Sequence, residues 1–164
     1  MSAIISPCNL HRYRLEREVQ TEGLVFAYFG INPSTADAVN NDATVRKWIG
    51  FTQRNGGRRF IVGNVFSIRS KEIKHLAAHT TMTAQGPEWA KHFKQIIEDA
   101  DVLVPCWGAS AKIPLHMRHM LDTVLAQLLA SGKPVKHFGL TACRQPKHPQ
   151  MLAYATPLIP WGVA

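Results

Sequence analysis

The chain of 164 residues has few cysteines, no long apolar run and no long block of one charge. Its three cysteines, Cys8, Cys106 and Cys143, are widely spaced, which argues against a disulfide framework and against a zinc ribbon. No apolar run approaches the roughly 18 residues of a membrane-spanning helix. Residues 1–7 lack the basic start and the apolar core of a signal peptide. We therefore expect a cytoplasmic protein with no membrane partner, no metal site and no cofactor.

The composition is that of a globular protein. Hydrophobic residues make up 46% of the chain and charged residues 18%, which excludes a disordered protein, and the length indicates one domain over residues 1–164. The formal net charge is +8 and is not concentrated in a tail. Because phosphate contacts dominate affinity for nucleic acids, this charge favours DNA or a nucleotide as partner. A generic basic soluble protein is the alternative.

Apolar runs alternate with helical patterns along the chain, which predicts an α/β fold with a parallel sheet. We expect strands at residues 11–19, 24–31, 60–66, 101–107 and 135–140. We expect helices at residues 42–54, 86–99 and 114–131, and a short one at 71–79. The first strand is expected at an edge of the sheet, with Arg12, Arg14 and Arg17 on a solvated face. Asn41 or Asp42 is the expected cap of the first helix.

The segment Gly30-Ile31-Asn32-Pro33-Ser34 directly follows the apolar run over residues 24–29. Glycine permits close backbone approach, proline stiffens the chain, and ligands of open α/β sheets bind at this carboxyl edge. Asn64, Trp107-Gly108 and His148 follow other expected strands, so we expect one shared cleft. For residues 30–34 alone, a strand followed by an ordinary turn is the alternative.

Taken in order, these strand ends resemble the uracil-DNA glycosylase superfamily. Gly30-Ile31-Asn32-Pro33 is similar to the first motif of its mismatch-specific branch, and residues 61–69 are similar to its middle strand. Residues 102–111 resemble its strand that ends in a glycine with a nearby alanine, and Lys147-His148-Pro149-Gln150 resembles its final His-Pro-Ser motif. The resemblance implies a three-layer α/β/α domain with a central, mainly parallel sheet of four to five strands.

A closer resemblance is to an uncharacterised bacterial and phage family known only as a domain of unknown function. The shared motifs are Arg12-Tyr13-x-Leu15-x-Arg17, Asn32-Pro33-Ser34-Thr35-Ala36-Asp37, Asn41-Asp42-x-Thr44-x-Arg46, Asn64-x-Phe66-x-x-Arg69, Trp107-Gly108 and Thr156-Pro157-Leu158-x-Pro160-Trp161. Compared with the glycosylases, Ser34 replaces a glycine and Gln150 replaces a serine. The acid that activates water in the uracil-specific branch is absent at the first motif, and Asp37 is the nearby substitute.

The glycosylase resemblance implies catalytic roles for four residues. Cleavage of an N-glycosidic bond passes through an oxocarbenium-like sugar and releases an anionic base, so the site must hold a water and offer donors to the base. Asn32 is expected to position the water, and Asp37 or Asp42 to make it more nucleophilic. His148 is expected to donate to the base oxygen as a neutral imidazole. For both aspartates a helix cap is the alternative role, and for His148 it is a surface position.

Further residues are candidates for substrate binding. The amide of Asn64 offers a donor and an acceptor to a pyrimidine edge, although capping a turn is its alternative role. Aromatic rings stack on bases, and the candidates for stacking are Phe29, Phe66 and Trp107. Packing in the core is the alternative for Trp107. The candidates for holding phosphate are Ser34, Arg46, Arg69, Ser110 and Lys147.

We therefore expect a glycosylase-like enzyme that acts on a nucleobase, a modified pyrimidine, in DNA or in a nucleotide. Duplex DNA would require base flipping, for which Met151-Leu152 is the candidate wedge. A non-catalytic module that binds a base, a nucleotide or DNA is the alternative, favoured by the missing acid after Asn32. An enzyme of the nucleotide pool, acting on a small phosphorylated substrate, is the third hypothesis.

Overall fold

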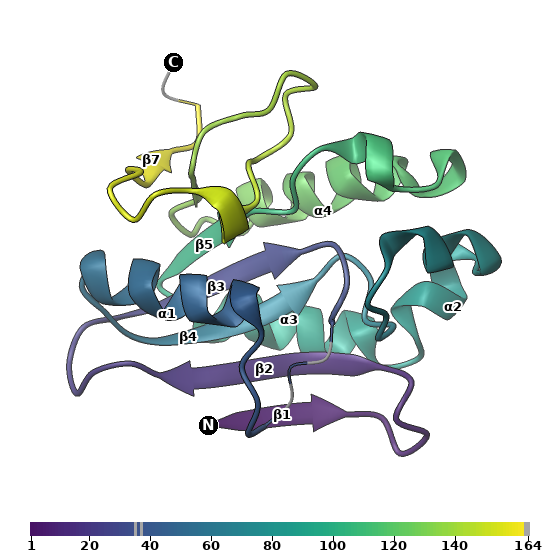
Figure 1. The fold of residues 1–164 in the computed structure, drawn as a ribbon, viewed down its shortest axis with the longest axis horizontal. Coiled ribbons are helices and arrows are strands. Elements are labelled where there is room, and N and C mark those ends of the chain that lie inside the picture. Colours follow the sequence, from purple (N-terminus) through teal and green to yellow (C-terminus); the bar gives the residue numbers. More distant parts are fainter. Residues whose placement is uncertain (35, 37, 163–164) are drawn as a thin grey trace.

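The computed structural model describes residues 1–34, 36 and 38–162 (Figure 1). Its centre is a five-stranded sheet with the strand order β1-β2-β4-β3-β5. The strands are β1 (Ser2–Ile5), β2 (Arg12–Glu18), β3 (Leu24–Gly30), β4 (Gly57–Asn64) and β5 (Val102–Pro105). β3 pairs in parallel with β4 and β5, whereas β2 pairs antiparallel with β1 and β4.

The expectation of a mainly parallel sheet is wrong, because the sheet is mixed. Short loops join β1 to β2 and β2 to β3, and a parallel pair needs a crossover of about a dozen residues or more. The short loops therefore reverse the chain direction, and β2 adds antiparallel to β4. β2 is also not the edge strand, since β1 covers its outer side.

Two of the four expected helices, those over residues 42–54 and 86–99, form nearly as expected, and the other two differ. The α-helices are α1 (Ala43–Arg54), α2 (Thr81–Gln85), α3 (Trp89–Asp99) and α4 (His119–Ala130). The 3₁₀ turns are η1 (Ile73–Ala78), η2 (Ser110–Lys112), η3 (Leu115–Met117) and η4 (Pro149–Met151). The expected helix over residues 71–79 is the 3₁₀ turn η1, and the one over 114–131 divides into η3 and α4.

The expected strand over residues 135–140 is reduced to β6 (Lys136–His137), which pairs with β7 (Ile159–Pro160). Gly139 has a φ of 95°, a conformation that ends an extended strand, and this explains the early stop. Within the described residues, no helix is long and apolar enough to cross a membrane.

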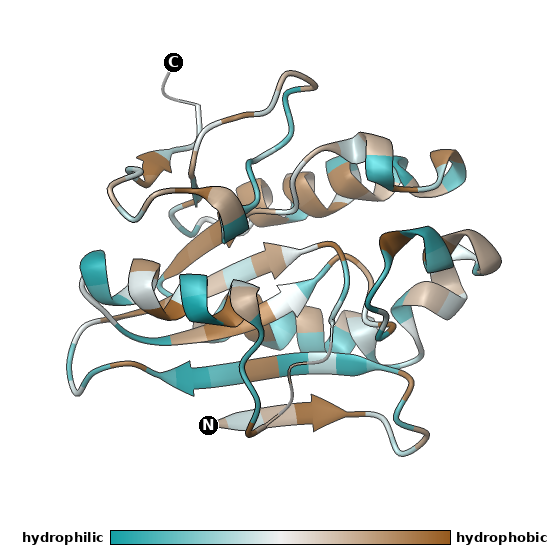
Figure 2. Ribbon diagram, in the orientation of Figure 1, coloured by the Kyte–Doolittle hydropathy of each residue, from teal (hydrophilic) through white to brown (hydrophobic). Residues whose placement is uncertain are grey.

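Each face of the sheet has its own apolar core. Side chains alternate along a strand, so neighbouring residues of β3 face opposite sides. Phe29 packs with residues of α3 and α4, whereas Phe26 and Tyr28 pack with residues of α1. In Figure 1, α1 lies in front of the sheet and α3 lies behind it. Figure 2 shows β5 as hydrophobic, whereas β2 is largely hydrophilic.

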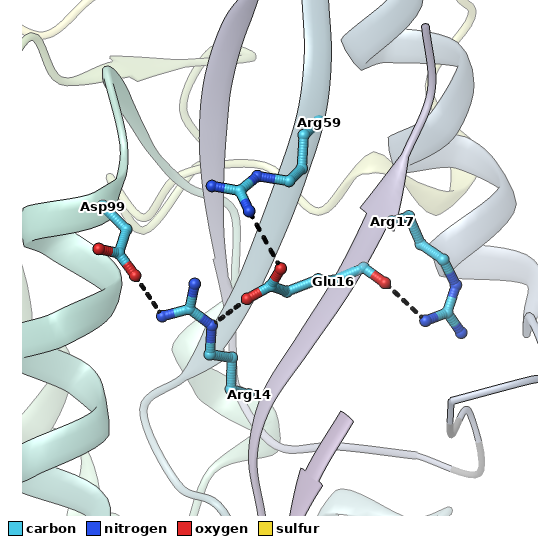
Figure 3. A network of polar contacts seen from close by, with 5 residues as sticks. All are labelled: Arg14, Glu16, Arg17, Arg59 and Asp99. Atoms are coloured by element: carbon cyan, nitrogen blue, oxygen red, sulfur yellow. Dashed lines mark hydrogen bonds and ion pairs between the residues drawn. The ribbon is translucent and has the colours of Figure 1, made fainter. Parts of the chain in front are cut away.

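The arginines of β2 are buried in a polar network, so the expectation of a solvated face is wrong. Arg14 is 8% exposed and donates from Nε to Glu16 and from Nη1 to Asp99 Oδ2 at 2.6 Å. Arg59 of β4 donates to the second oxygen of Glu16 at 3.3 Å (Figure 3). A buried charge is stable only when it is paired and hydrogen-bonded, and these partners meet that condition.

Arg17 ties β2 to the loop that precedes α1. It is 1% exposed, and its Nε donates to Asn41 Oδ1 at 2.7 Å while its Nη2 donates to Asn40 O at 3.3 Å. Arg12, which also lies on β2 and is 3% exposed, donates to Ala36 O at 2.5 Å. These bonds hold residues 36, 40 and 41, which precede α1, against β2.

Candidate functional site

A cleft lies where the carboxyl ends of the parallel strands meet. The chain runs from β3 through α1 to β4 on one side, and later to β5 on the other side of β3. Such a reversal of strand order leaves a crevice at the carboxyl ends of the strands, where α/β proteins bind ligands. The cleft here has a volume of about 620 Å³, within the usual range for small-molecule sites.

The cleft brings together predicted site residues from four segments that are far apart in the sequence. Those that line it are Asn32, Ser34, Asp42, Asn64, Trp107, Lys147 and His148. They follow β3, β4 and β5 and occupy the segment that precedes η4, as the pattern of strand ends predicts. Their chemical roles stay predictions.

Two aromatic residues predicted to stack on a base do not line the cleft. Phe29 and Phe66 are both 0% exposed, and the ring of Phe29 lies 5.3 Å from that of Phe93 of α3. Trp107 does line the cleft but is 2% exposed, and its indole N–H donates to Gln145 Oε1 at 2.7 Å. Trp107 therefore forms part of the floor and anchors the segment that carries His148.

Three residues predicted to hold phosphate lie outside the cleft lining. Arg46 donates to the backbone oxygen of Asn41 at 2.7 Å, and Arg69 donates to the side chain of Asn9. Ser110 lies 3.8 Å from the sulfur of Cys143. Asp37, predicted to activate water, lies outside the described residues.

Asn64 presents a buried amide to the cleft at the end of β4. The residue is 6% exposed, and within the described chain its side-chain amide has no hydrogen-bond partner. Its backbone oxygen accepts a hydrogen bond from Trp89 Nε1 at 2.9 Å, which fixes this end of the strand. Because no protein group of the described chain pairs with this amide, its donor and acceptor are available to a ligand in the cleft.

Gly30 makes room for that amide. A Cβ atom at Gly30 would lie 2.8 Å from Asn64 Oδ1, which is closer than real Cβ atoms approach. Gly30 pairs with Asn64 across β3 and β4 in parallel register. Only a glycine at this position leaves the Asn64 side chain where it lies, and this contact links the first motif of the sequence to the second.

Asn32 points its carbonyl oxygen away from the protein acceptors around it. Its Nδ2 group donates to Ser70 O at 3.0 Å and to Pro33 O at 3.2 Å. An amide nitrogen is a donor only, so these backbone oxygens fix the orientation of the group. In the described residues, Oδ1 has no partner, and Asn32 lines the cleft. The oxygen is thus placed to accept a hydrogen bond from a water or a ligand.

His148 lines the cleft as a neutral imidazole with a defined tautomer. Its Nδ1 accepts a hydrogen bond from the backbone N–H of Gln150 at 3.3 Å, so the proton lies on Nε2. Burial lowers the pKa of His148 below the ordinary value of 6.5, the charge of Lys112 lowers it further, and Asp42 opposes this shift. The lowered pKa favours the neutral imidazole, whose Nε2–H can donate into the cleft, and donation to a base stays a prediction.

The backbone of Gly108 holds the His148 segment against β5. Gly108 has a φ of 81°, and its N–H donates to Pro146 O at 2.8 Å. A Cβ atom here would lie 3.2 Å from the Cβ atom of His148. Both the left-handed conformation and the close approach require glycine. The Trp107-Gly108 pair thus positions the imidazole.

Asp42 is both a helix cap and a wall of the cleft. Its Oδ1 accepts a hydrogen bond from the backbone N–H of Val45 at 2.8 Å, which confirms the predicted cap of α1. The side chain lines the cleft, and its charge acts on His148. The capping role and a role in the cleft are therefore compatible.

The predicted site residues did not include several residues of the cleft lining, three of them cations. Arg12, Lys71 and Lys112 line the cleft, as do Thr44 and Thr141. Arg12 and Thr44 stand in the family motifs without a predicted role in the cleft, whereas no motif marks Lys71, Lys112 or Thr141. Among the described residues, no group of three or more metal-ligating side chains lies together.

These features define an α/β protein with a polar, cationic cleft at a topological switch point. The chain belongs to a family of proteins of unknown function, DUF1643, whose family model matches residues 12–150. The predicted membership of an uncharacterised family is thereby confirmed. The matched segment runs from β2 to η4 and includes nearly the whole cleft. No curated protein and no solved structure matches the chain.

Proposed function

We propose that the protein binds a pyrimidine base in this cleft and hydrolyses its N-glycosidic bond. The single observation that carries the proposal is Asn64, a residue that is 6% exposed, lines the cleft and has no hydrogen-bond partner for its side-chain amide in the described chain. A pyrimidine edge supplies the neighbouring acceptor and donor that a carboxamide needs. A ligand with apolar atoms alone would leave the donor and the acceptor of the Asn64 amide unpaired, at a cost of about 1–3 kcal/mol.

The reaction needs a water on one side of the sugar and a donor at the leaving base. Asn32 Oδ1 accepts a hydrogen bond from the water, and Asp42 is the described carboxylate of the cleft that withdraws its proton. The Nε2–H of His148 donates to the base oxygen, where negative charge develops as the bond breaks. The donor in this step is the neutral imidazole, because burial disfavours the imidazolium form of His148.

The likeness to the uracil-DNA glycosylase superfamily is part of this proposal. Residues from α1 pack on one face of the sheet and residues from α3 and α4 on the other, which fits a three-layer arrangement. The cleft residues Asn32, Asn64 and His148 occupy the motif positions in the same order along the chain. The mixed sheet departs from the expected parallel one at β1 and β2, whereas the strands β3, β4 and β5 are parallel.

A base-reading module without catalysis is the second candidate. The observation that favours it is the hydrogen bond from Val45 to Asp42, which occupies one carboxylate oxygen. An oxygen that accepts this backbone hydrogen bond is not free to bind a water, so one oxygen of Asp42 is left for that role. Both candidates require Asn64, and only the enzyme requires Asn32 and Asp42 to act on a water.

The test is a base-release assay. Oligonucleotides that carry uracil, hydroxymethyluracil and other modified pyrimidines are incubated with the protein, beside the corresponding nucleotides, and released base is measured by mass spectrometry. We expect release from at least one substrate, reduced about 10²–10³-fold in His148→Ala and about 10–100-fold in Asn64→Ala. Asn55→Ala is the matched control, since its amide bonds to Phe51 O within α1 and lies outside the cleft lining.

The outcomes separate the candidates. Binding without release, lost in Asn64→Ala and retained in Asp42→Asn, would establish the reading module instead of the enzyme. Absence of both binding and release across the whole panel would overturn both candidates.

A further inference from the structure

The lining of the cleft carries an excess of positive charge. Lys71, Lys112 and Lys147 line it together with the buried Arg12, whereas Asp42 is the one carboxylate of the lining within the described residues. The three lysines come from three different segments, after β4, after β5 and before η4. Like charges repel, so gathering them at one cleft has a cost unless an anion binds there.

Two of these lysines lie on the same wall. Lys71 precedes Ile73 and Lys112 precedes Ile113, and both isoleucines belong to the apolar cluster on the α3 and α4 face. The two segments also touch, since Nε2 of His116 lies 3.2 Å from the backbone oxygen of His79. Asp42 lies at the start of α1, whose residues pack on the opposite face. Lys71 and Lys112 therefore lie on the side of the cleft opposite Asp42.

The three lysines of the cleft lining are not used by the fold. Within the described chain, none of Lys71, Lys112 and Lys147 has a side-chain hydrogen bond or an ion-pair partner, and all three are exposed. By contrast, Lys133 donates to Ala100 O at 2.7 Å and Lys47 donates to Leu152 O at 2.7 Å. The charge of the three lysines is thus available to a ligand in the cleft.

The distribution of the cations favours a compact ligand over a strand of nucleic acid. A single strand is held by a row of cations along its backbone and by exposed aromatic rings. Here the aromatic residues of the cleft lining, Trp48 and Trp107, are 4% and 2% exposed. The cations Arg46 and Arg69 beyond it donate to Asn41 and Asn9.

We propose that the cleft binds a free nucleotide with two or three linked phosphates, held by Lys71, Lys112 and Lys147 while Asn64 holds the base. The inference rests on the proposed function, because it assigns the substrate class of the same cleft. A diphosphate chain carries about three negative charges at neutral pH, since its last ionisation has a pKa near 6. The charge of the diphosphate chain therefore matches that of the three lysines. The sugar lies between the lysines and Asp42.

The test is isothermal titration of the full chain with inorganic tripolyphosphate, which has no base. We expect binding that weakens about tenfold or more in each of Lys71→Gln, Lys112→Gln and Lys147→Gln, the effect of losing one charge-assisted hydrogen bond. Lys91→Gln is the matched control, because Lys91 is exposed on α3 and lies outside the cleft lining. Each substitution is at an exposed position, so the fold is retained.

A second titration compares deoxyuridine, its triphosphate and a 12-nucleotide oligodeoxyuridine. We expect the triphosphate to bind most tightly, with the lysine variants removing its advantage over the nucleoside. An oligonucleotide that binds more tightly than the triphosphate, and that weakens in Arg46→Gln or Arg69→Gln, would overturn the free nucleotide in favour of a strand.

The result for tripolyphosphate is independent of base cleavage. If tripolyphosphate does not bind, or binds all lysine variants and the wild type equally, the phosphate site is wrong, while base release still decides the proposed function. If tripolyphosphate binds through the lysines and no base is released from any substrate, the phosphate site stands and the hydrolase fails.

Discussion

The substitution Gly30→Ala tests whether Asn64 reads a ligand without disturbing the fold. The one atom of the described chain that a Cβ atom here would meet within 4 Å, its neighbours aside, is Asn64 Oδ1 at 2.8 Å. The φ of Gly30 is not positive, so alanine fits the strand without backbone strain. Replacing a glycine at such a position stabilises a protein by about 0.4–1 kcal/mol, through the unfolded chain.

The magnitude follows from the distance. Ordinary contact begins at 3.4 Å, so Oδ1 must retreat from 2.8 Å by about 0.6 Å. A hydrogen bond of about 2.9 Å to a base would then exceed about 3.4 Å, where it is largely lost. Losing one buried hydrogen bond costs about 1–3 kcal/mol, which is about 5- to 150-fold in affinity.

The assay pairs urea unfolding with titration of whichever pyrimidine ligand the wild type binds. We expect Gly30→Ala to unfold within about 1 kcal/mol of the wild type and to bind about 5- to 150-fold more weakly. In an Asn64→Ala background the same substitution should change affinity no further. Gly132→Ala is the control, because Gly132 has a φ of 75° and open space around it, so only stability falls. Unchanged affinity in Gly30→Ala would refute the role of Asn64.

The remaining predictions concern His148, Asp42 and the tail. Because the pKa of His148 is lowered, the unfolded chain binds more protons near pH 6, so this residue's contribution to stability is complete above pH 6.5 and is lost as the pH falls towards its lowered pKa. An NMR titration of its ring protons should give a midpoint below 6.5, and a midpoint above that value would contradict the burial argument. Asp42→Asn retains the cap of α1, whereas Asp42→Ala costs about 0.5–2 kcal/mol in urea unfolding. Only the enzyme hypothesis predicts lost turnover in Asp42→Asn. Because the charge of Asp42 raises the pKa of His148, the titration midpoint of His148 should fall further in that variant. Gly50→Ala would place a Cβ atom 2.4 Å from Tyr154 Cε1, so we expect it to destabilise by about 1–3 kcal/mol. In a Tyr154→Ala background the sign should reverse to a gain of about 1 kcal/mol, because alanine favours a helix.

The features that the sequence predicted best are those set by local chemistry. Asp42 caps α1 through a bond to Val45, three residues away, and the apolar run before Gly30 forms β3. The order of strand ends was sufficient to predict that Asn32, Asn64 and His148 share one cleft, since parallel strands place their carboxyl ends at one edge.

The features that the sequence did not predict depend on distant partners. Arg14 is buried because Glu16 and Asp99 accept its hydrogen bonds, and Asp99 lies 85 positions away on α3. Lys112 reaches the cleft because its segment touches that of His79 through His116. Periodicity carries no information about such contacts, so an alternating polar strand was expected to be solvated.

Binding at Asn64, Asn32 and His148 together is the central claim, and NMR spectroscopy of the ¹⁵N-labelled chain tests it most directly. Free pyrimidine bases and their nucleotides are titrated while the side-chain amide signals of both asparagines and the Nε2 signal of His148 are followed. We expect at least one of these compounds to shift all three sets of signals with one dissociation constant. Shifts that leave Asn64 and His148 unchanged, or no shifts with any compound, would contradict it.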